Sequence, residues 1–543
     1  MDTQSSGLAD KINLAEVKAR SKAGWQDKQH YLPQLNEAYE FAIPYRKPVD
    51  EAVTQSMPGE NRVDRVFDNT AIVSTVRFAG KLQNDLLPPE QSFFTLEAGP
   101  ISKMVSEDAA AFTQTLQQDA TVINALFQGG EFSTAVQEMF LDLAAGTGAM
   151  LILPGDEERP VRFVAVPISE IALEAGAYSD ISAIFFKKKW SKRAIKSTWP
   201  KGHFSDALKK DMEDAKKQSD TLVICQDTYW NPEEKKWVLV VYVENDKETK
   251  PIAVSTSRAC PWAVPRYYKV AGETYGRGPI QVTLPTIKSL NKAQELSLKA
   301  AAFAILGIWT AVDDGVFNPK MARLAPGAIW RVARNGGLLG PSVQKLDLPG
   351  RFDTSQIVLN ELRMQVKEGL LDQQLPPDGA TPRSASEIME RVKRLASEHN
   401  GALGRLVQEG VVPMVRRVME IAHDKGLLVS KQPIDRLLID IKITSPMAVA
   451  MRAQQAKIWA DFIQLCEALL MNGTVASEII ELYEMLAEIG RSMGVPEKYL
   501  KTKGQQRQVQ KQIEQGVQQA MAAAVEAQKQ QQQAAGLAAP AAA

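Results

Sequence analysis

Three long helical patterns, separated first by a compact β-like stretch and then by a loop, constrain this chain more than any other feature. Apolar residues recur at helical spacing over residues 278–305 and again over residues 354–374. Between them, residues 308–350 contain short β-like runs joined by turns. A third helical pattern runs from residue 385 to residue 424. This order is poorly suited to an enclosed pocket, and it favours a radial building block whose helices surround a hole.

Start and bend signals mark these helical patterns. Ser384 and Glu387 match the S-x-x-E capping box, which satisfies N–H groups at the start of a helix. Pro285 predicts a bend in the first pattern, because proline removes a helical hydrogen bond. Glycines and a proline predict bends in the third pattern as well. These positions are Gly401, Gly404, Gly410 and Pro413. We therefore predict a long, kinked helix over residues 385–424.

The N-terminal half changes character near residue 149. Residues 1–148 contain a succession of helical patterns, whereas residues 149–270 contain short β-rich runs bounded by Gly and Pro. The sequence NPEEK at 231–235 reads as a hairpin turn, so the sheet is expected to be mostly antiparallel. A Lys-rich segment, residues 187–217, interrupts the runs. Two interpretations stay open for it: a nucleic-acid contact, or a solvated, mobile insert in which acidic residues are mixed.

The C-terminal part combines a short strand with helices. LIDIKI at 438–443 reads as a strand, and two helical patterns follow over residues 446–472 and 475–491. The tail, residues 500–543, is rich in Gln and Ala and carries only a sparse apolar stripe. Such a stripe cannot bury a core alone, so the tail needs neighbours to fold.

Charge and length limit the functions that this chain can have. Its 543 residues predict two to four domains. Lys and Arg number 64 and Asp and Glu number 64, so the formal net charge is zero. A protein that holds nucleic acid tightly usually carries a basic surplus, because each neutralised phosphate adds affinity. Tight DNA binding is therefore not expected. A net charge of zero is, however, compatible with contact to DNA that must slide past the protein.

Motifs for chemistry are sparse. The three cysteines lie far apart and form no CxxC, and the four histidines have no metal-ligand spacing. YGRG at 275–278 lacks the third glycine of a phosphate-binding loop. Asp313 and Asp314 precede Gly315 and read as a turn, because adjacent strand residues point to opposite faces. We predict no catalytic residue, no cofactor and no metal.

Targeting and membrane signals are missing as well. The N-terminal stretch is polar and charged, unlike a signal peptide. The longest apolar run, residues 300–312, is shorter than the ~20 residues that span a bilayer. We expect synthesis in a cytoplasm and no membrane insertion.

Three segments, residues 271–307, 379–421 and 78–99, carry a likeness to one known family. Together they resemble the head-to-tail connector, or portal, family of short-tailed (podovirus) bacteriophages. Residues 271–307 resemble the family's Gly-Glu-x-Tyr-Gly-Arg approach to its first long helix. Residues 379–421 resemble its loop-to-helix passage, and residues 78–99 resemble its N-terminal LFP segment. The likeness spans most of residues 7–495, and its motifs identify the family without marking an active site.

The resemblance implies a predominantly α-helical α+β fold, the phage portal fold, assembled as a ring that usually has twelve subunits. That fold is divided into wing, stem, clip and crown. The implied parts are the N-terminal wing (1–270), the first stem helix (271–307), the clip (308–350), the second stem helix (351–374), the tunnel loop (375–384), the long kinked helix (385–424), the C-terminal wing helices (425–499) and the crown (500–543).

The same resemblance implies a function and a set of partners. The ring would lie at the unique portal vertex of a virion made in a host cytoplasm. Terminase, through its large subunit, would package double-stranded DNA through the ring, and the DNA would later be ejected through it. Identical subunits, the tail adaptor or tail tube proteins, and the major capsid and scaffolding proteins would be the other partners.

Three groups of site residues follow from this assignment. The tunnel loop would touch DNA with Pro376, Pro377, Asp378, Gly379, Thr381, Pro382 and Arg383. Candidates for the stem channel are Lys288, Lys292, Lys299 and Lys367, each of which could instead pair with a neighbouring subunit. Turns of the clip that would face the adaptor are Asp313, Asp314, Gly315, Asn335 and Gly336. Prolines stiffen the tunnel loop and Gly379 permits a sharp turn. An ordinary connection between two helices is the alternative interpretation of that loop.

Two other functions stay open at this point. The first is a metal-dependent DNA-processing enzyme that uses Asp313, Asp314 or Asp440. The second is an internal virion protein that is ejected with the genome, which would lack the compact β stretch between paired helices.

Overall fold

The computed structural model of the chain mixes helices with antiparallel sheets, which confirms the expected α+β class. It forms two compact units, each described here by itself. The first contains Met1–Gln91, Thr121–Ala385 and Glu398–Ile434, and the second contains Ser92–Ala120, Ser386–Ser397 and Asp435–Ala543. The structure describes residues 12–46, 63–89, 91–99, 109–129, 131–214, 217–245, 250–306, 308–311, 343–346, 352–372, 402–430 and 439–445.

A five-stranded antiparallel sheet forms one part of the first unit. Its order is β4-β5-β6-β7-β8, so every strand pairs with its neighbour in sequence. The strands are β4 (Ile171–Ala175), β5 (Ile181–Ser191), β6 (Thr221–Asn231), β7 (Lys236–Val243) and β8 (Ala253–Ser257). The first four match the β-rich runs EIALEAG (170–176), ISAIFFKKKW (181–190), TLVICQDTYW (221–230) and KKWVLVVYVE (235–244), and β8 has no such run.

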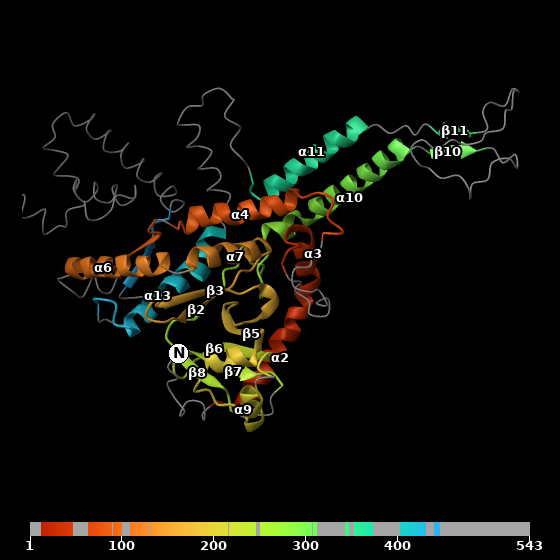
Figure 1. The fold of residues 1–543 in the computed structure, drawn as a ribbon. Helices are drawn as coiled ribbons and strands as arrows, with labels where there is room; N and C mark the ends of the chain where they lie inside the picture. Colours follow the sequence, from red (N-terminus) through yellow and green to blue (C-terminus); the bar gives the residue numbers. More distant parts are fainter. Residues whose placement is uncertain are drawn as a thin grey trace, which may run out of the picture. The chain divides into compact units, whose positions relative to one another are not determined.

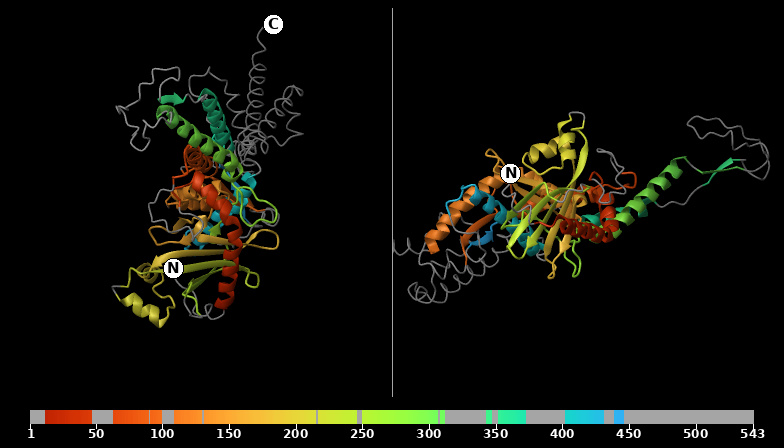
Figure 2. Two further views of the ribbon diagram at one scale, coloured as in Figure 1. Left: turned by 90° about the vertical axis from the view of Figure 1, so that its right-hand side faces the viewer. Right: turned by 90° about the horizontal axis from the view of Figure 1, so that it is seen from below.

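Helices cover both faces of this sheet. On one face lie α8 (Lys192–Thr198) and α9 (Asp206–Glu213), whose flanking residue Trp199 joins a buried cluster with Ile224. On the other face lies α2 (Leu14–Lys28), with Leu14 and Val17 packed against Val240 (Figure 2). The sheet therefore completes its core with segments of its own chain.

Close contact between α2 and the sheet depends on a small residue. A Cβ added at Gly24 of α2 would lie 2.6 Å from the ring of Phe185, which is fully buried on β5. Arg20 of α2 also forms a two-point ion pair with Glu174 of β4, at 2.6 and 2.7 Å. The helix is thus fixed against the sheet by shape and by charge.

The Lys-rich segment 187–217 is built into this sheet region. It forms the end of β5 and then α8 and α9, which begin at Ser191 and Ser205 with a side-chain cap. Ile195 and Met212 are buried in the sheet core. The described residues of this segment are therefore part of the sheet region and not a separate insert, while many of its lysines face solvent as expected.

An ionisable side chain, Asp227, is enclosed within the same sheet. It lies on β6, has no exposed surface, and accepts a hydrogen bond of 2.7 Å from the hydroxyl of Tyr242. Burial raises the pKa of Asp227 to about 7, although the hydrogen bond from Tyr242 and the nearby ammonium of Lys187 oppose this shift. The carboxyl is therefore largely protonated at mildly acidic pH.

A second sheet of the first unit has the order β3-β2-β9 and consists of Val161–Ala165, Met150–Pro154 and Trp262–Ala263. Helix α7 (Phe132–Ala144) packs against β3 and against α4 (Thr70–Leu86). Phe132 of α7 meets Phe163 of β3 with ring centres 4.9 Å apart. These aromatic contacts join the helices to the sheet.

Two long helices of the first unit run antiparallel to each other (Figures 1 and 2). They are α10 (Pro279–Leu306) and α11 (Phe352–Gly369), close to the expected helices at 278–305 and 354–374. Their direction follows from two contacts: Gly369 lies against Thr283, and Arg363 donates to Gln294. We call α10 and α11 the helical pair. At its far end, β10 (Ile308–Ala311) pairs with β11 (Val343–Leu346).

The inner ends of the helical pair contact shorter helices of the same unit. Helix α10 packs against α3 (Leu32–Ala42), which follows the 3₁₀ turn Gln29–Tyr31, and α11 packs against α4. Pro285 lies inside α10, and the hydroxyl of Ser289 donates to the Pro285 carbonyl.

The long helix expected over residues 385–424 is described from residue 402 onward. It contains a π-helical turn at Leu406–Val411, followed by α13 (Val412–Asp424), which packs against β2 and β9. The irregularity falls beside Gly410 and Pro413, two of the positions that predicted bends. Residues 385–401, the helices expected at 446–472 and 475–491, and the tail 500–543 lie outside the described residues.

The second unit contains a two-stranded sheet. Strand β1 (Phe94–Ala98) pairs antiparallel with β12 (Ile439–Ile443), which confirms the strand expected in LIDIKI. Lys442 bonds Glu97 across the pair at 2.8 Å. The first part of α6 (Ala109–Gln128) also belongs to this unit, and its residues from Thr121 onward belong to the first unit.

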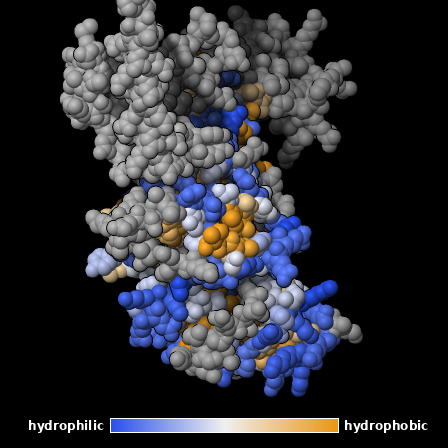
Figure 3. All heavy atoms as spheres, turned by 90° about the vertical axis from the view of Figure 1, so that its left-hand side faces the viewer, coloured by the Kyte–Doolittle hydropathy of each residue, from blue (hydrophilic) through white to orange (hydrophobic). Residues whose placement is uncertain are grey.

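Hydrophilic residues dominate the described surface on the face shown in Figure 3, where they surround a compact group of hydrophobic residues. Among the described helices, none combines the length and the apolar content needed to cross a membrane.

Candidate functional site

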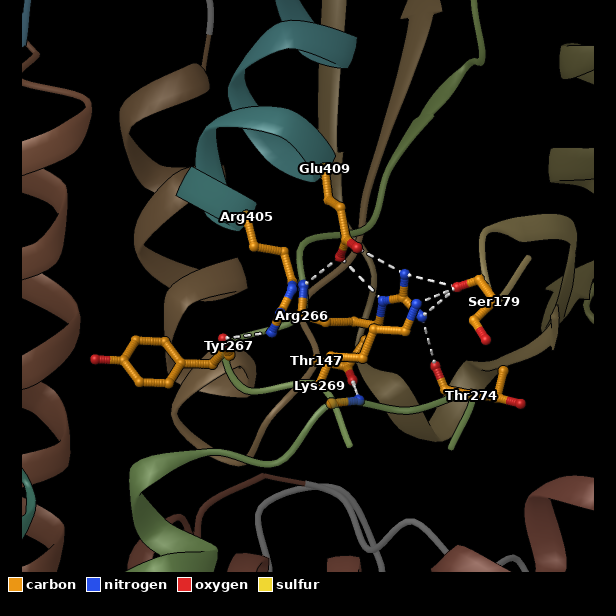
Figure 4. A network of polar contacts seen from close by, with 9 residues as sticks. Thr147, Ser179, Arg266, Tyr267, Lys269, Thr274, Arg405 and Glu409 are labelled. Carbon is orange, nitrogen blue, oxygen red and sulfur yellow. Dashed lines mark hydrogen bonds and ion pairs between the residues drawn. The ribbon is translucent and has the colours of Figure 1, made fainter. Parts of the chain in front are cut away.

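A network of polar contacts around Arg266 fastens the segment that leads into α10 (Figure 4). The guanidinium of Arg266 is almost fully buried and binds both carboxylate oxygens of Glu409, with Nη2–Oε1 at 2.6 Å and Nε–Oε2 at 2.9 Å. Its Nη1 also donates to the carbonyls of Ser179 and Thr274, at 3.3 and 3.2 Å. A charged pair with this geometry is the strong, two-point type. Arg266 therefore joins the π-helical turn, the β4–β5 turn and the approach to α10.

The π-helical turn explains how Glu409 reaches Arg266. Pro413 has no N–H and cannot donate to the carbonyl of Glu409, so the α-helical pattern is interrupted at this place. A π turn changes the direction of the side chains that it carries, and such turns often occur at functional positions. Arg405, one turn earlier, donates to the carbonyl of Tyr267 at 3.4 Å. Two side chains of this helix thus hold the segment before α10.

Three glycines allow two backbones to touch at the start of α10. A Cβ added at Gly278 would lie 2.0 Å from the Ala144 carbonyl oxygen, and one at Gly276 would lie 2.5 Å from the Gly146 oxygen. Gly146 itself has φ of +131°, which only glycine adopts readily. The glycine pair of YGRG therefore serves close packing of the backbone, in agreement with the missing phosphate-loop pattern.

The tyrosine and arginine of the same motif have structural roles. Tyr275 is buried, its ring lies 4.8 Å from that of Tyr31, and its oxygen accepts a hydrogen bond of 3.0 Å from the Leu173 backbone N–H. Burial raises the pKa of Tyr275, so it stays protonated. Arg277 pairs with Glu273 at 2.6 Å. The segment that resembled the family's approach to its first long helix is thus a packed anchor for α10.

Residues before α4 anchor both members of the helical pair. The Asn291 side-chain oxygen on α10 accepts from the backbone N–H groups of Phe67 and Asp68, at 2.9 and 3.1 Å. Arg363 on α11 donates to the Asp68 carboxylate at 2.9 Å. Burial alone would raise the pKa of Asp68, but hydrogen bonds from Thr70 and Arg363 outweigh it and lower that pKa. An ionised Asp68 therefore holds α11 at neutral pH.

The C-terminal end of α11 has a Schellman geometry. Asp372 N–H donates to the Lys367 carbonyl and Leu371 N–H to the Glu368 carbonyl, with Leu371 at a φ of +57°. Three residues on one stripe of α4 then hold this end. Ser74 and Arg77 donate to the Asp372 carboxylate at 2.8 and 3.3 Å, and Lys81 donates to the Leu371 carbonyl at 3.5 Å.

Large apolar side chains remain exposed along the helical pair. They are Val282 (67% exposed), Leu296 (54%) and Leu298 (50%) on α10, and Ile357 (67%), Val358 (46%) and Met364 (70%) on α11. Val282 and Leu296 are fourteen residues apart, and Ile357 and Met364 are seven apart, so each pair lies on one helical face. Each helix therefore presents large exposed apolar side chains on one face, a feature that interaction surfaces often have.

The lysines proposed for a channel mostly have partners within the chain. Lys288 pairs with Glu37 of α3 at 2.7 Å. Lys292 and Lys299 both pair with Glu295, which lies between them on α10. Lys367 is exposed on α11. The structure does not bring the four together as one cluster, and their assignment to a channel stays a prediction.

The other expected site residues lie outside the described residues. These are the tunnel-loop residues Pro376, Pro377, Asp378, Gly379, Thr381, Pro382 and Arg383, and the clip turns Asp313, Asp314, Gly315, Asn335 and Gly336. Their roles remain predictions.

Within the described residues, no group of three or more His, Cys, Asp or Glu side chains is placed to hold a metal. Asp440, proposed for a metal-dependent enzyme, lies on β12 opposite Glu97 of β1. Cys225 is buried on β6, and burial raises its pKa to about 12, so its thiol is not a ready nucleophile.

Arg266, Glu409 and Gly146 were not found from the sequence. Arg266 and Glu409 are 143 positions apart; Arg266 lies in none of the segments singled out from the sequence, and Glu409 lies in residues 379–421, which were noted only for their family likeness. A weak signal existed for the helix, because Gly410 and Pro413 predicted an irregularity beside Glu409. Nothing comparable pointed to Arg266.

Comparison with known families gives a match over most of the chain. A family model described as "Bacteriophage head to tail connecting protein" matches residues 14–500. A search of curated proteins finds no match.

Solved structures show a weaker likeness. One is titled "Virion of native gene transfer agent (GTA) particle", with a TM-score of 0.29 and 11% identity over 73% of this chain and 89% of that chain. Another is titled "Neck of empty GTA particle computed with C6 symmetry", with a TM-score of 0.32 and 10% identity over 79% of this chain and 90% of that chain.

Proposed function

This chain belongs to the family of bacteriophage head to tail connecting proteins, and from that premise we propose that it is the portal subunit of a phage particle. Identical copies form a ring, with twelve subunits expected, at one vertex of the capsid. Double-stranded DNA passes through the ring when terminase packages it and again when it is ejected through a short tail. Tail adaptor, capsid and scaffolding proteins bind the outside of the ring.

The exposed apolar faces of the helical pair are the observation that carries this proposal. α10 and α11 bury one side against each other and against α3 and α4. Val282, Leu296, Ile357 and Met364 lie on the remaining sides and are each more than half exposed. In a closed ring, one heterologous contact is repeated by rotation, so α10 of one copy can cover α11 of the next. A monomer offers no such cover for these side chains in the described part of the chain.

The division into parts follows from the same proposal. Residues 1–270 and 425–499 form the wing, the helical pair forms the stem, and residues 308–350 form the clip. The tunnel loop, residues 375–384, begins three residues after Asp372, whose carboxylate is held by Ser74 and Arg77 of α4. Residues 500–543 form the crown.

A neutral chain suits a passage through which DNA slides. Simultaneous contacts from many basic side chains would hold the phosphates and slow the DNA. The net charge of zero, and the pairing of Lys292 and Lys299 with Glu295, support a weakly charged stem. The tunnel loop would then supply short contacts of both charge signs through Asp378 and Arg383.

Assembly of the purified full-length chain tests the ring. We expect rings with an open centre in negative-stain images, and one large mass in mass photometry. Met364→Glu should weaken assembly strongly, because it places a charge on the apolar face. Gln365→Glu is the matched control, since Gln365 is an exposed polar residue next to it. A compact single copy, or rings that form equally well with both variants, would contradict the proposal.

The tunnel loop needs a separate experiment in assembled particles. Residues 377–382 are replaced by a Gly/Ser linker of equal length, and the length of packaged genome and the retention of DNA are measured. Shorter genomes or DNA leakage are expected. Unchanged packaging and retention would reduce the loop to an ordinary connection between helices.

A further inference from the structure

The inward side of α2 changes from apolar to polar along the helix. Its buried residues follow one stripe at helical spacing and are Leu14, Val17, Ser21, Gly24 and Lys28. The first two pack against the sheet as an apolar contact. The last three offer a hydroxyl, a bare backbone and an ammonium group, which contribute little hydrophobic stabilisation. The second half of α2 therefore depends on polar contacts for its place on the sheet.

A buried ammonium group fastens the C-terminal end of α2. Lys28 Nζ donates to three backbone carbonyls at 2.6, 3.2 and 2.7 Å, those of Ile168, Ser169 and Ile171. It also lies 4.5 Å from the ring centre of Trp25, one turn earlier on α2. Because the carbonyls replace water around the charge, this end of the helix is firmly held.

Asp227 lies under the middle of the same helix. It pairs in register with Phe185 on β5 and with Val240 on β7, and such cross-strand partners share one face of a sheet. Phe185 lies against Gly24 of α2, and Val240 belongs to the cluster that packs with α2. Asp227 therefore faces α2, and Ser21 of that helix is close enough to influence the pKa of Asp227.

The groups of the sheet that face Asp227 compensate a negative charge poorly. Tyr242 donates to Oδ2 at 2.7 Å, whereas Oδ1 has no hydrogen-bond partner within the described part of the chain. The nearby Lys187 ammonium group is bonded to Glu244, whose own charge opposes ionisation of Asp227. Cys225 is uncharged, because burial raises its pKa to about 12.

Helix α2 does not supply the missing compensation either. Ser21 offers a neutral hydroxyl, Lys18 lies 5.4 Å from the ring centre of Tyr242, and Arg20 is engaged by β4. Among the described residues, none forms an ion pair with Asp227. An ionised Asp227 is thus a buried charge without a counter-ion, which is costly, and displacement of α2 would let water reach it.

We propose that α2 is a pH-sensitive strap: protonated Asp227 lets it close on the sheet, and ionisation of Asp227 loosens it. The neutral carboxyl fits the dry contact beneath Ser21, and the carboxylate gains hydration when α2 lifts and its proton passes to solvent. Helix α2 leads through the 3₁₀ turn into α3, where Glu37 pairs with Lys288 of α10 at 2.7 Å. The strap therefore ends beside the helical pair. This device acts within a single copy and does not require a ring.

Hydrogen exchange of the full-length chain at about pH 5 and about pH 8 tests the strap. Protection factors, corrected for the intrinsic effect of pH on exchange, are compared for α2 and for α13, which packs against β2 and β9. Protection of α2 should fall by at least about tenfold from the lower to the higher pH, because Asp227 has a pKa of about 7 when covered and about 3.9 when exposed. Protection of α13 should change by less than about twofold.

Two variants separate the strap from a general loosening of α2. Asp227→Asn cannot ionise, so protection of α2 should change by less than about twofold between the two pH values. Arg20→Met removes an ion pair of α2, so protection should be about threefold lower at both pH values while the fall between them remains. Asp142, whose pKa burial raises to about 6, titrates in the same range, but it is bonded to Tyr39 of α3 and is present in both variants.

Three results would contradict the proposal: equal protection of α2 at the two pH values, an equal fall in α2 and α13, or an undiminished fall in Asp227→Asn. If Asp227→Asn does not fold, Tyr242→Phe replaces it. This variant removes a donor to the Asp227 carboxylate and so raises the pKa of Asp227 further. The pH at which protection of α2 stops falling should then move upward, and an unmoved value would also overturn the proposal.

Discussion

The five-stranded sheet and the helical pair bury their apolar residues by different means. Both faces of the sheet are covered by helices of the same chain, α2 on one side and α8 and α9 on the other. The helical pair is covered on one side only, and leaves large side chains such as Ile357 and Met364 mostly exposed. The difference teaches that folding of one copy covers the sheet, whereas in the proposed ring the exposed side of the helical pair would be covered by neighbouring copies.

The Arg266 network lies where these two regions are joined. Through Ser179 it holds the β4–β5 turn of the sheet, and through Thr274 it holds the approach to α10. The Arg266 guanidinium thus connects the sheet to the start of α10, while the backbones at Gly276 and Gly278 fix the same segment against Gly146 and Ala144. This contrast leads to four predictions, from the largest expected effect on the stability of a single chain to the smallest.

Truncation inside the sheet should be the most damaging change. Phe185→Ala removes a fully buried ring that packs under Gly24 of α2. We expect a loss of about 3–5 kcal/mol in the free energy of unfolding, because a large cavity remains. Urea unfolding and hydrogen exchange of β5 and β6 measure it. A loss below 1 kcal/mol would show that the sheet does not depend on its own core.

Breaking the ion pair at the junction should have the next largest effect. Arg266→Met removes the guanidinium that pairs with the Glu409 carboxylate and donates to the Thr274 carbonyl, whereas the Ser179 carbonyl keeps its bond from Lys269. A loss of about 2–4 kcal/mol in the free energy of unfolding is expected. Hydrogen exchange should rise in the first turn of α10 more than in β6. The double variant Arg266→Met/Glu409→Leu should recover part of the loss, since no unpaired charge remains. If the double variant is as unstable as the single one, the charge is not the cause.

Asp227 makes the stability of the sheet depend on pH. Its pKa in the folded chain, about 7 because of burial, exceeds the unfolded value of about 3.9. The folded chain therefore binds the proton more strongly, and the free energy of unfolding falls as pH rises from about 4 to about 7, by at most about 4 kcal/mol. At pH values above or below this window, the contribution of Asp227 to the free energy of unfolding stays constant.

Replacement of this carboxyl sharpens the test. Asp227→Asn keeps an oxygen that can accept the hydrogen bond from Tyr242 and cannot ionise. Urea unfolding at about pH 5 and about pH 8 should show a smaller difference for the variant than for the parent chain. An equal difference in both would place the pH dependence elsewhere.

Truncation on the exposed face of α11 should change the single chain least. Ile357→Ala removes a side chain that is mostly exposed, and a change within about 0.5 kcal/mol is expected for dissociated subunits. Leu359→Ala, two positions along the same helix, removes a buried side chain and should cost about 2–5 kcal/mol. Urea unfolding at concentrations below assembly compares the two, and equal losses would remove the distinction between the two faces of α11.

Local patterns predicted the fold well where they were regular. Apolar residues at helical spacing gave α4, α10 and α11, and β-rich runs gave β2 to β7. The missed strands were short or sat in polar surroundings: β8 reads AVSTS, β9 has two residues, and β1 lies in a segment noticed only for its family likeness. Their pairing depends on partners far away in sequence, as for β1 with β12.

The candidate site was harder to predict for the same reason. The glycines of YGRG were noticed, but their function needed Gly146, which packs against Gly276 from a distant segment. Arg266 and Glu409 are ordinary charged residues until the fold brings them together. Ile195 and Met212 connect the segment 187–217 to the sheet core. They were overlooked because they stand among many Lys and acidic residues.

The strand pair at the far end of the helical pair has a consequence for evolution and for engineering. Ala311 and Val343 are partners in register on β10 and β11, so the stretch 312–342 starts and finishes at neighbouring points. Each doubling in the length of such a closed stretch costs only about 0.6 kcal/mol, if it is flexible. A change in the length of residues 312–342 should therefore cost the helical pair little stability. This position is thus suited to the insertion of a domain or an affinity tag.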